Sequence, residues 1–249
     1  MAKDERNDRV LEMVRGGSFD YLDFGTHKGG GLRVGRELGG VAGLGVELQD
    51  DKVKELFQRG AFAYSGNVLE FPDAANIRFA VCSHVLEHMP SIFEIGTVIN
   101  KLAAICQDFI FIRQPSFDSQ EQLFERGLKM AHFTMKHHDC RITVRQFVDM
   151  MWDLRLERFV IGGALPYASS DSSWFHSTAG RKNVGKWTTN DPPKPSIKFS
   201  RPVHRDIVLC IALRPDVDLM RVAKAGGMTQ VFMESTQMEH VPDMPWPVG

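Results

Sequence analysis

Short apolar runs alternate with amphipathic stretches along the first half of the chain. The runs FDYLDF, VAGLGVEL, AFAYSG, IRFAVCS and DFIFIRQP are typical of buried strands, because they are short and bounded by glycine, proline or polar residues. Between them, DDKVKELFQRG and SIFEIGTVINKLAAIC have the spacing of helices with one apolar face. Strands that alternate with helices predict a parallel sheet covered by helices on both faces.

The second half of the chain is less regular. TVRQFVDMMWDL predicts a helix, LERFVIGG a strand and RDIVLCIAL a final strand, which a polar stretch of about forty residues delays. We expect one domain over residues 1–214 and, because periodicity is weak after Arg214, a C-terminal tail over residues 215–249. The seven predicted strands begin near Phe19, Val41, Ala61, Ile77, Asp108, Leu156 and Asp206.

Composition narrows the class of protein. The 249 residues are 43% hydrophobic, which suits one substantial core. Lys and Arg number 30 against 31 Asp and Glu, so a global basic field that captures nucleic acid is absent and a nucleic-acid partner is not expected. The four cysteines are too far apart for a CxxC zinc site and read as reduced, buried thiols. A charged N-terminus and the lack of a long apolar run favour a cytoplasmic protein without membrane contact.

The segment YLDFGTHKGGG carries the clearest chemical signal. Glycines between a strand and a helix let the backbone approach a ligand, and Glu47 ends the second strand about twenty residues after Gly25. A carboxylate at this place can accept both ribose hydroxyls of a nucleotide. The GxGxxG pattern that seats a dinucleotide pyrophosphate is missing, so the sequence predicts a different nucleoside-containing cofactor.

These segments resemble the class I (Rossmann-like) S-adenosylmethionine-dependent methyltransferases. The resemblance rests on Asp23, Phe24, Gly25 and Gly29 in the first turn, on Glu47, on SGNVLEFP and on FAVCSHVLEHMPS, and it covers roughly residues 19–160. It implies an α/β fold with a doubly wound, mostly parallel seven-stranded sheet whose last strand is antiparallel, here with a long insertion before that strand.

The resemblance also implies S-adenosyl-L-methionine as cofactor and a set of residues around it. Two positions depart from the family pattern: His27 stands where a second glycine is common, and Asn67 where aspartate is common. The turn after the first strand would flank the methionine part, Glu47 would bind the ribose, and Asn67 would face the adenine. The implied cofactor-binding residues are Asp23, Gly25, Thr26, His27, Glu47, Leu48, Asn67, Val68, Ser83 and His84.

Histidines supply the candidate general bases. His84 follows the fourth strand, and HFTMKHH places His132 and His138 in the region where similar enzymes bind their acceptor. The spacing HVLEH leaves a metal site at His84, Glu87 and His88 as an alternative, since it resembles the metal-binding segment of the small-RNA 2′-O-methyltransferases. That family has glutamate at the position of His84, and we expect no metal.

The expected function is transfer of a methyl group to a hydroxyl of a small molecule or saccharide. Two irregular segments, about 114–142 and 163–204, are expected to bind this acceptor. One alternative is an RNA 2′-O-methyltransferase-like enzyme, and another is an inactive methyltransferase-like binding protein. Whether two chains form a homodimer stays open. The RNA alternative predicts a basic face assembled from Arg113, Lys129, Lys136, Arg141 and Lys186.

Overall fold

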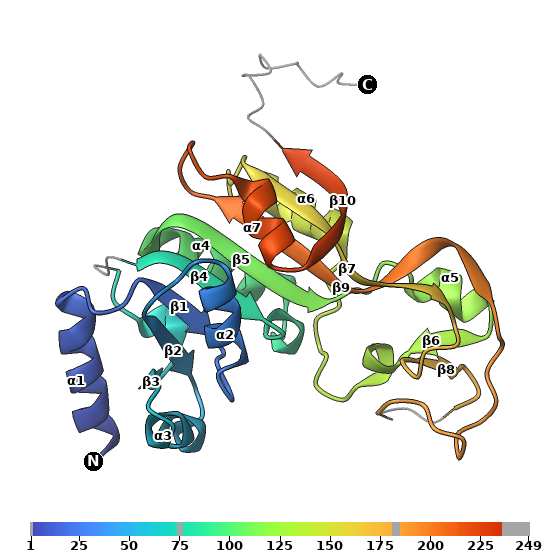
Figure 1. The fold of residues 1–249 in the computed structure, drawn as a ribbon, viewed down its shortest axis with the longest axis horizontal. Coiled ribbons are helices and arrows are strands. Elements are labelled where there is room, and N and C mark those ends of the chain that lie inside the picture. Colours follow the sequence, from blue (N-terminus) through green and yellow to red (C-terminus); the bar gives the residue numbers. More distant parts are fainter. Residues whose placement is uncertain (1, 74–76, 181–184, 236–249) are drawn as a thin grey trace, which may run out of the picture.

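One central sheet decides where ligands can bind. The computed structural model describes residues 2–73, 77–180 and 185–235, and within them eight strands form one sheet in the order β10-β7-β9-β5-β4-β1-β2-β3. Strands β1 to β5 run parallel, whereas β9 is antiparallel to β5 and β7, and β10 is antiparallel to β7. These strands are β1 (Tyr21–Phe24), β2 (Gly43–Glu47), β3 (Phe62–Ser65), β4 (Ile77–Ser83), β5 (Cys106–Pro115), β7 (Phe159–Ser169), β9 (Lys198–Ala212) and β10 (Met228–Ser235) (Figure 1).

Helices cover both faces of this sheet, as the alternating pattern predicts. Ile95 of α4 and Phe147 of α6 are fully buried on one face, while Ala223 of α7 is fully buried on the other. Val53 of α3 packs on Ala63 of β3. The helices around the sheet are α1 (Lys3–Arg15), α2 (Gly30–Glu37), α3 (Asp50–Gln58), α4 (Ile92–Ile105), α6 (Val144–Asp153) and α7 (Leu219–Ala225).

The predicted doubly wound, mostly parallel sheet is confirmed, with one strand more than expected. Strands β1 to β5, β7 and β9 correspond to the seven predicted strands. As expected, the last of these, β9, is antiparallel to its neighbours. Residues 215–235, expected within a C-terminal tail, instead form α7 and β10. Strand β10 was not predicted, because an exposed strand at the edge of a sheet tolerates the mixture of polar and apolar residues seen in TQVFMES. Residues 236–249 lie outside the described residues.

The two irregular segments meet in a lobe that projects from the sheet. Strands β6 (Leu128–Met130) and β8 (Phe175–Ser177) pair antiparallel, which ties one segment to the other. The lobe also contains α5 (Gln120–Glu125) and the 3₁₀ helix η3 (Ala131–Thr134), and Figure 1 shows it reached through β5, β7 and β9. Its own apolar cluster is Phe117, Leu123, Leu128, Met130, Phe133, Phe175 and Val203.

Helix α1 protects the other end of the sheet. The Asn7 side chain donates to the Ser65 carbonyl (2.9 Å) and accepts from the Ser65 amide (2.9 Å), so the edge strand β3 has no free pairing position there. The four cysteines are free and buried, as expected. Among the helices of the described residues, none is long and apolar enough to cross a membrane.

Candidate functional site

A cavity of about 830 Å³ opens at the carboxyl ends of the parallel strands. Its wall comes from the segments that follow β1, β2, β3 and β4. The order of the sheet reverses between β1 and β4, and such a reversal leaves a crevice in which ligands bind in open α/β sheets. The lining includes Gly25, Thr26, His27, Glu47, Leu48, Ser83, His84, Val85, His88, Met89 and His137.

The turn after β1 requires two of its glycines. Gly25 has a φ of +69°, and a Cβ there would lie 2.4 Å from Cγ2 of Val85. A Cβ on Gly31, in the first turn of α2, would lie 1.8 Å from Oδ1 of Asp23. Asp23 is therefore beneath the turn and 1% exposed, and it is not among the residues that line the cavity. Its burial raises the pKa of Asp23 to about 7, and the nearby charge of Glu47 acts in the same direction.

Glu47 is the best-placed polar group for a ribose. Its Oε2 accepts from the His27 amide (2.9 Å) and its Oε1 from the Gln49 amide (3.0 Å), which fixes the carboxylate against the glycine turn. Each carboxylate oxygen has a second lone pair, so both can still accept a hydroxyl. Leu48, beside it, is 66% exposed and offers an apolar surface inside the cavity.

The structure places Asn67 and Val68 differently from the expected adenine contacts. The Asn67 side chain accepts from the Leu69 amide (3.0 Å) and caps the 3₁₀ helix η1 (Val68–Glu70). Val68 is fully buried in the main core. Neither residue lines the cavity, whereas Gly66 does. The segment after β3 therefore reaches the cavity one residue earlier than the resemblance implies.

His84 faces the cavity between two carboxylates. Its Nδ1 lies 3.5 Å from Oε1 of Glu87, and its Nε2 lies 3.7 Å from Oδ2 of Asp206. The His84 side chain is 42% exposed, while both carboxylate side chains are at most 2% exposed. An accessible imidazole backed by buried carboxylates is an arrangement that can accept a proton and stabilise the resulting cation.

Asp206 is held by two arginines. Its Oδ2 accepts from Nε of Arg113 (2.8 Å), and its Oδ1 accepts from Nε of Arg205 (3.0 Å). Burial opposes ionisation, but the hydrogen bond from Arg205 and the charges of His84, Arg113 and Arg205 hold the pKa of Asp206 below its ordinary value. Asp206 therefore remains a carboxylate behind His84 at neutral pH.

The other two candidate bases are not in the cavity wall. His132 is 3% exposed, its Nε2 donates to the Ser116 carbonyl (2.7 Å), and burial lowers its pKa to about 4. His138 is half-buried and burial lowers its pKa as well. Its ring packs edge-on against His88, with centroids 5.1 Å apart. The structure thus separates His132 from His84 and brings His138 beside His88.

Strained backbone concentrates around the cavity. Positive φ occurs at five non-glycine residues of the described chain, and three of them are the cavity-lining histidines His27 (+44°), His84 (+57°) and His137 (+78°). Non-glycine residues in this region persist only where the surroundings enforce it, and they cluster at functional sites. At His27 the backbone adopts the left-handed conformation that the glycine of the family pattern would supply.

Comparison with known proteins identifies the fold of the chain that carries this site. No protein-family model matches the chain, and no curated protein matches it. A SAM-dependent methyltransferase from Archaeoglobus fulgidus is similar in structure, with a TM-score of 0.54 and 14% identity over 85% of this chain and 94% of that one. Another from Thermotoga maritima has a TM-score of 0.50 and 12% identity over 86% and 90% of the two chains. The chain has the class I methyltransferase fold.

Sequence reasoning missed several residues of this methyltransferase-fold site. Asp206 lies within an apolar strand, and nothing in the local pattern indicates that the pairing of β9 with β5 brings it close to His84. Val85 and His137 line the cavity through backbone turns that the apolar pattern does not encode. The one available signal was HVLEH itself, which indicated a cluster of polar groups after β4.

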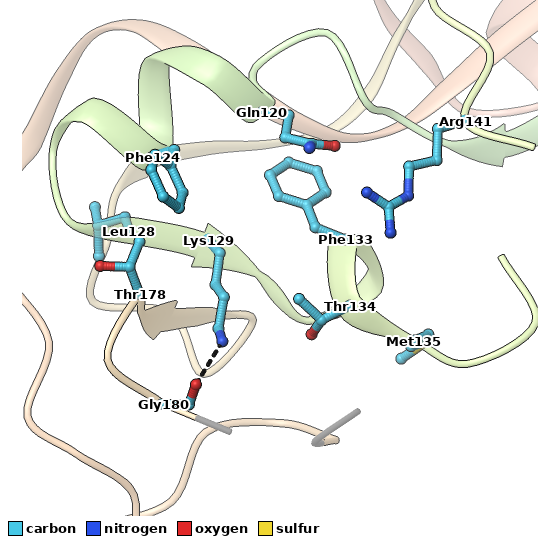
Figure 2. A pocket seen from close by; sticks show the side chains of 10 residues that line it. All are labelled: Gln120, Phe124, Leu128, Lys129, Phe133, Thr134, Met135, Arg141, Thr178 and Gly180. Atoms are coloured by element: carbon cyan, nitrogen blue, oxygen red, sulfur yellow. Dashed lines mark hydrogen bonds between the residues drawn. The ribbon is translucent and has the colours of Figure 1, made fainter. Parts of the chain in front are cut away.

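A second cavity, of about 410 Å³, lies in the lobe that this chain adds to the methyltransferase fold. Figure 2 shows Phe124, Phe133 and Arg141 around the same hollow, with the Lys129 amine donating to the Gly180 carbonyl (2.9 Å). Met135 lines this cavity and His137 lines the larger one, so the backbone between them borders both.

Proposed function

We propose that the protein is an S-adenosylmethionine-dependent methyltransferase that acts on a hydroxyl group of a small molecule or glycan. The observation that carries the proposal is the buried Glu47 carboxylate, fixed by two backbone amides beside the Gly25 turn at the switch point of the sheet. The class I methyltransferase fold and the cavity's volume, within the usual range for ligand pockets, support it.

The residues of the cavity fit the parts of this cofactor. Glu47 would accept the ribose hydroxyls, and the exposed face of Leu48 would contact the adenine. Gly25 lines the cavity, and the lack of a side chain there would let the backbone of the turn approach the methionine part. Thr26, His27 and Ser83 would complete the wall around it.

His84 is the group best placed to take a proton from the acceptor. Bound S-adenosylmethionine supplies an already activated methyl group, so the protein must align the acceptor oxygen and remove its proton. The imidazole of His84 would take that proton, and the Asp206 carboxylate, 3.7 Å away, would stabilise the imidazolium. Arg113 and Arg205 keep Asp206 ionised for this role.

The lobe is the proposed source of acceptor specificity. Met135 and His137 are two residues apart, at most about 7 Å along the chain, so an elongated acceptor that passes His137 would come close to the second cavity. Two of the five basic residues that the RNA alternative requires are engaged in other contacts, whereas the other three are exposed. Arg113 is hydrogen-bonded to Asp206, and Lys129 is 8% exposed and bonded to Gly180, so neither contributes to an open basic face.

Calorimetric titration tests the cofactor site first. Cofactor-free protein should bind S-adenosylmethionine and S-adenosylhomocysteine with micromolar affinity, about −8 kcal/mol. Glu47→Gln keeps the size of the side chain but removes its charge, and should weaken binding about 10- to 100-fold. Glu55→Gln, on the exposed side of α3, is the matched control and should bind as the wild type does. Absence of binding to either ligand would overturn the proposal.

Turnover then tests the base. With an acceptor found by screening for S-adenosylhomocysteine release, His84→Gln should lower kcat by about 10²- to 10⁴-fold. Asp206→Asn keeps the shape of the side chain behind His84 and should lower kcat with less effect on KM. An unchanged pH profile in His84→Gln would remove His84 from the chemistry.

A further inference from the structure

We propose that Glu87, His88 and His138 form a binding site for one divalent transition-metal ion, with zinc as the reference ion. One ligand atom from each of the three residues lies within 4.8 Å of the others. A zinc ion with bonds of about 2.1 Å needs a spacing of roughly 3.4 Å, which small side-chain rotations supply. Two imidazoles and one carboxylate are donors that zinc and its neighbours in the first transition row accept.

Both histidines are already oriented as metal ligands. Nδ1 of His88 lies 2.6 Å from the His137 carbonyl, and Nδ1 of His138 lies 3.1 Å from the His132 carbonyl. A carbonyl oxygen accepts only, so each Nδ1 must carry the hydrogen, and each Nε2 is left with its lone pair free to bind an ion. A backbone carbonyl that fixes the ring in this way is characteristic of metal-binding histidines.

Glu87 supplies an independent reason for a cation. Its side chain is 2% exposed, and Oε2 has no hydrogen-bond partner within the described parts of the chain. A buried carboxylate oxygen without a partner carries a desolvation cost. A metal ion bound between Glu87 and the two imidazoles would remove that cost by neutralising the charge.

The ligand set differs from the one that sequence spacing suggests. HVLEH groups His84 with Glu87 and His88, but the structure puts His138, from the lobe, in the third position. His84 points between Glu87 and Asp206 instead. The ion would therefore join the sheet to the lobe at the wall of the larger cavity, which His88 lines.

Three protein ligands leave coordination positions open. Sites of this kind hold a water molecule or a substrate oxygen, whereas structural zinc sites use four protein ligands. We infer that an open position faces the cavity and would bind an oxygen of the acceptor, beside His84. This last step rests on the proposed methyltransferase function, but binding of the ion does not.

Titration of the full chain with zinc chloride, after treatment with a chelator and without cofactor or acceptor, tests the site. The wild type should bind one zinc ion per chain, and the cobalt(II) form should show visible d–d absorption of a low-coordinate site. Glu87→Gln and His138→Ala should each weaken zinc binding by more than about 100-fold, because loss of a ligand exceeds the 10- to 100-fold effect of losing an outer partner.

Two controls make the result specific. His176→Ala removes a buried histidine of the lobe outside the cluster, and should leave zinc affinity unchanged. His84→Ala should also retain the ion. Circular dichroism and thermal unfolding of each metal-free variant establish that it is folded. Wild-type affinity in His138→Ala, zinc loss in His84→Ala with retention in His138→Ala, or no zinc binding by the wild type would each overturn the proposal.

The two proposals fail separately. Loss of zinc binding with intact S-adenosylmethionine binding would remove the metal site alone, since the titration contains no methyl donor. Zinc binding without cofactor binding would keep the site and remove the methyltransferase function. In that second case the acceptor role of the open position falls with the proposed function, while the ligand set stands.

Discussion

The parallel half of the sheet and the projecting lobe are assembled from different kinds of contact. Around the cavity, Gly25, Glu47, Gly66 and His84 each lie at or just after the end of a strand, so the position of each depends on a short stretch of chain. In the lobe, β6 pairs with β8, which lies more than forty positions later in the sequence. A site at the ends of strands can therefore be predicted from short stretches of sequence. The fold of a lobe made of two insertions depends on contacts between distant segments, which the local sequence pattern does not indicate.

Two buried aspartates show the same contrast in electrostatic terms. Asp23, in the parallel half, has no described cation beside it, and burial raises its pKa to about 7. Asp206, where the sheet passes into the lobe, is as deeply buried, but Arg113 and Arg205 keep its pKa below the ordinary value. Burial alone therefore does not fix the charge of an aspartate; the two arginines beside it, one on the neighbouring strand β5 and one on β9 itself, decide it.

Phe175→Ala should unfold the lobe and leave the parallel half of the sheet folded. Phe175 is fully buried among lobe residues, and truncation of such a ring costs about 3–5 kcal/mol. Hydrogen exchange should lose protection at β6 and β8 but keep it at β1 and β2, and S-adenosylmethionine affinity should stay within about threefold. Uniform loss of protection across the sheet would show that the two regions unfold together.

Phe79→Ala is the matched variant in the sheet. Phe79 is also fully buried, stacked between Tyr21 (5.2 Å) and Phe109 (4.5 Å). It should lower the stability of the parallel half and abolish cofactor binding together. An equal effect of the two variants on cofactor affinity would contradict the separation of the regions.

Asp23→Asn should change how stability depends on pH. Because the folded chain holds the Asp23 proton more tightly than the unfolded chain, the wild type loses stability as pH rises from about 4 to about 7. The shift corresponds to a loss of up to roughly 4 kcal/mol across that window, which the asparagine variant should lack. Urea unfolding at pH 4.5, 6 and 8 measures the difference between the two proteins. Parallel curves would show that Asp23 ionises normally.

Gly25→Ala should cost about 3 kcal/mol, the sum of a left-handed backbone and a clash with Val85. Gly17→Ala isolates the first contribution, because Gly17 has a φ of +70° and nothing within 4 Å of its Cβ position. That control should cost about 1 kcal/mol. Chemical unfolding and calorimetry of both variants test the pair. If they are equally destabilised, the approach of Val85 does not constrain the turn.

The sequence predicted most of the fold and the polar end of the cofactor site. The strands that end at or just before Gly25, Glu47 and Ser83 are strongly apolar, and the glycine and acidic residues that mark their ends are close in sequence. What it missed depends on tertiary contact: β10 has an edge strand's mixed pattern, and Asp206 reaches His84 only once β9 has paired with β5. His138 joins Glu87 and His88 only because the lobe folds back to the cavity wall.

His27→Gly should have the smallest effect, and it tests why a histidine can stand in the glycine turn. Glycine relieves a left-handed backbone worth about 1–2 kcal/mol but loses roughly 0.5–1 kcal/mol of chain entropy, so stability should stay within about 1 kcal/mol of the wild type. Cofactor affinity should change by less than about threefold, because the bond to Glu47 comes from the backbone amide.

His27→Val completes this test. A β-branched residue at a φ of +44° is strongly disfavoured, so valine should destabilise the turn where glycine does not. Weaker cofactor binding in the valine variant, with wild-type binding in the glycine variant, would show that the turn requires a left-handed backbone and an amide directed at Glu47. Loss of binding in His27→Gly would instead assign the contact to the imidazole, and the departure from the glycine pattern would then be a feature of cofactor recognition.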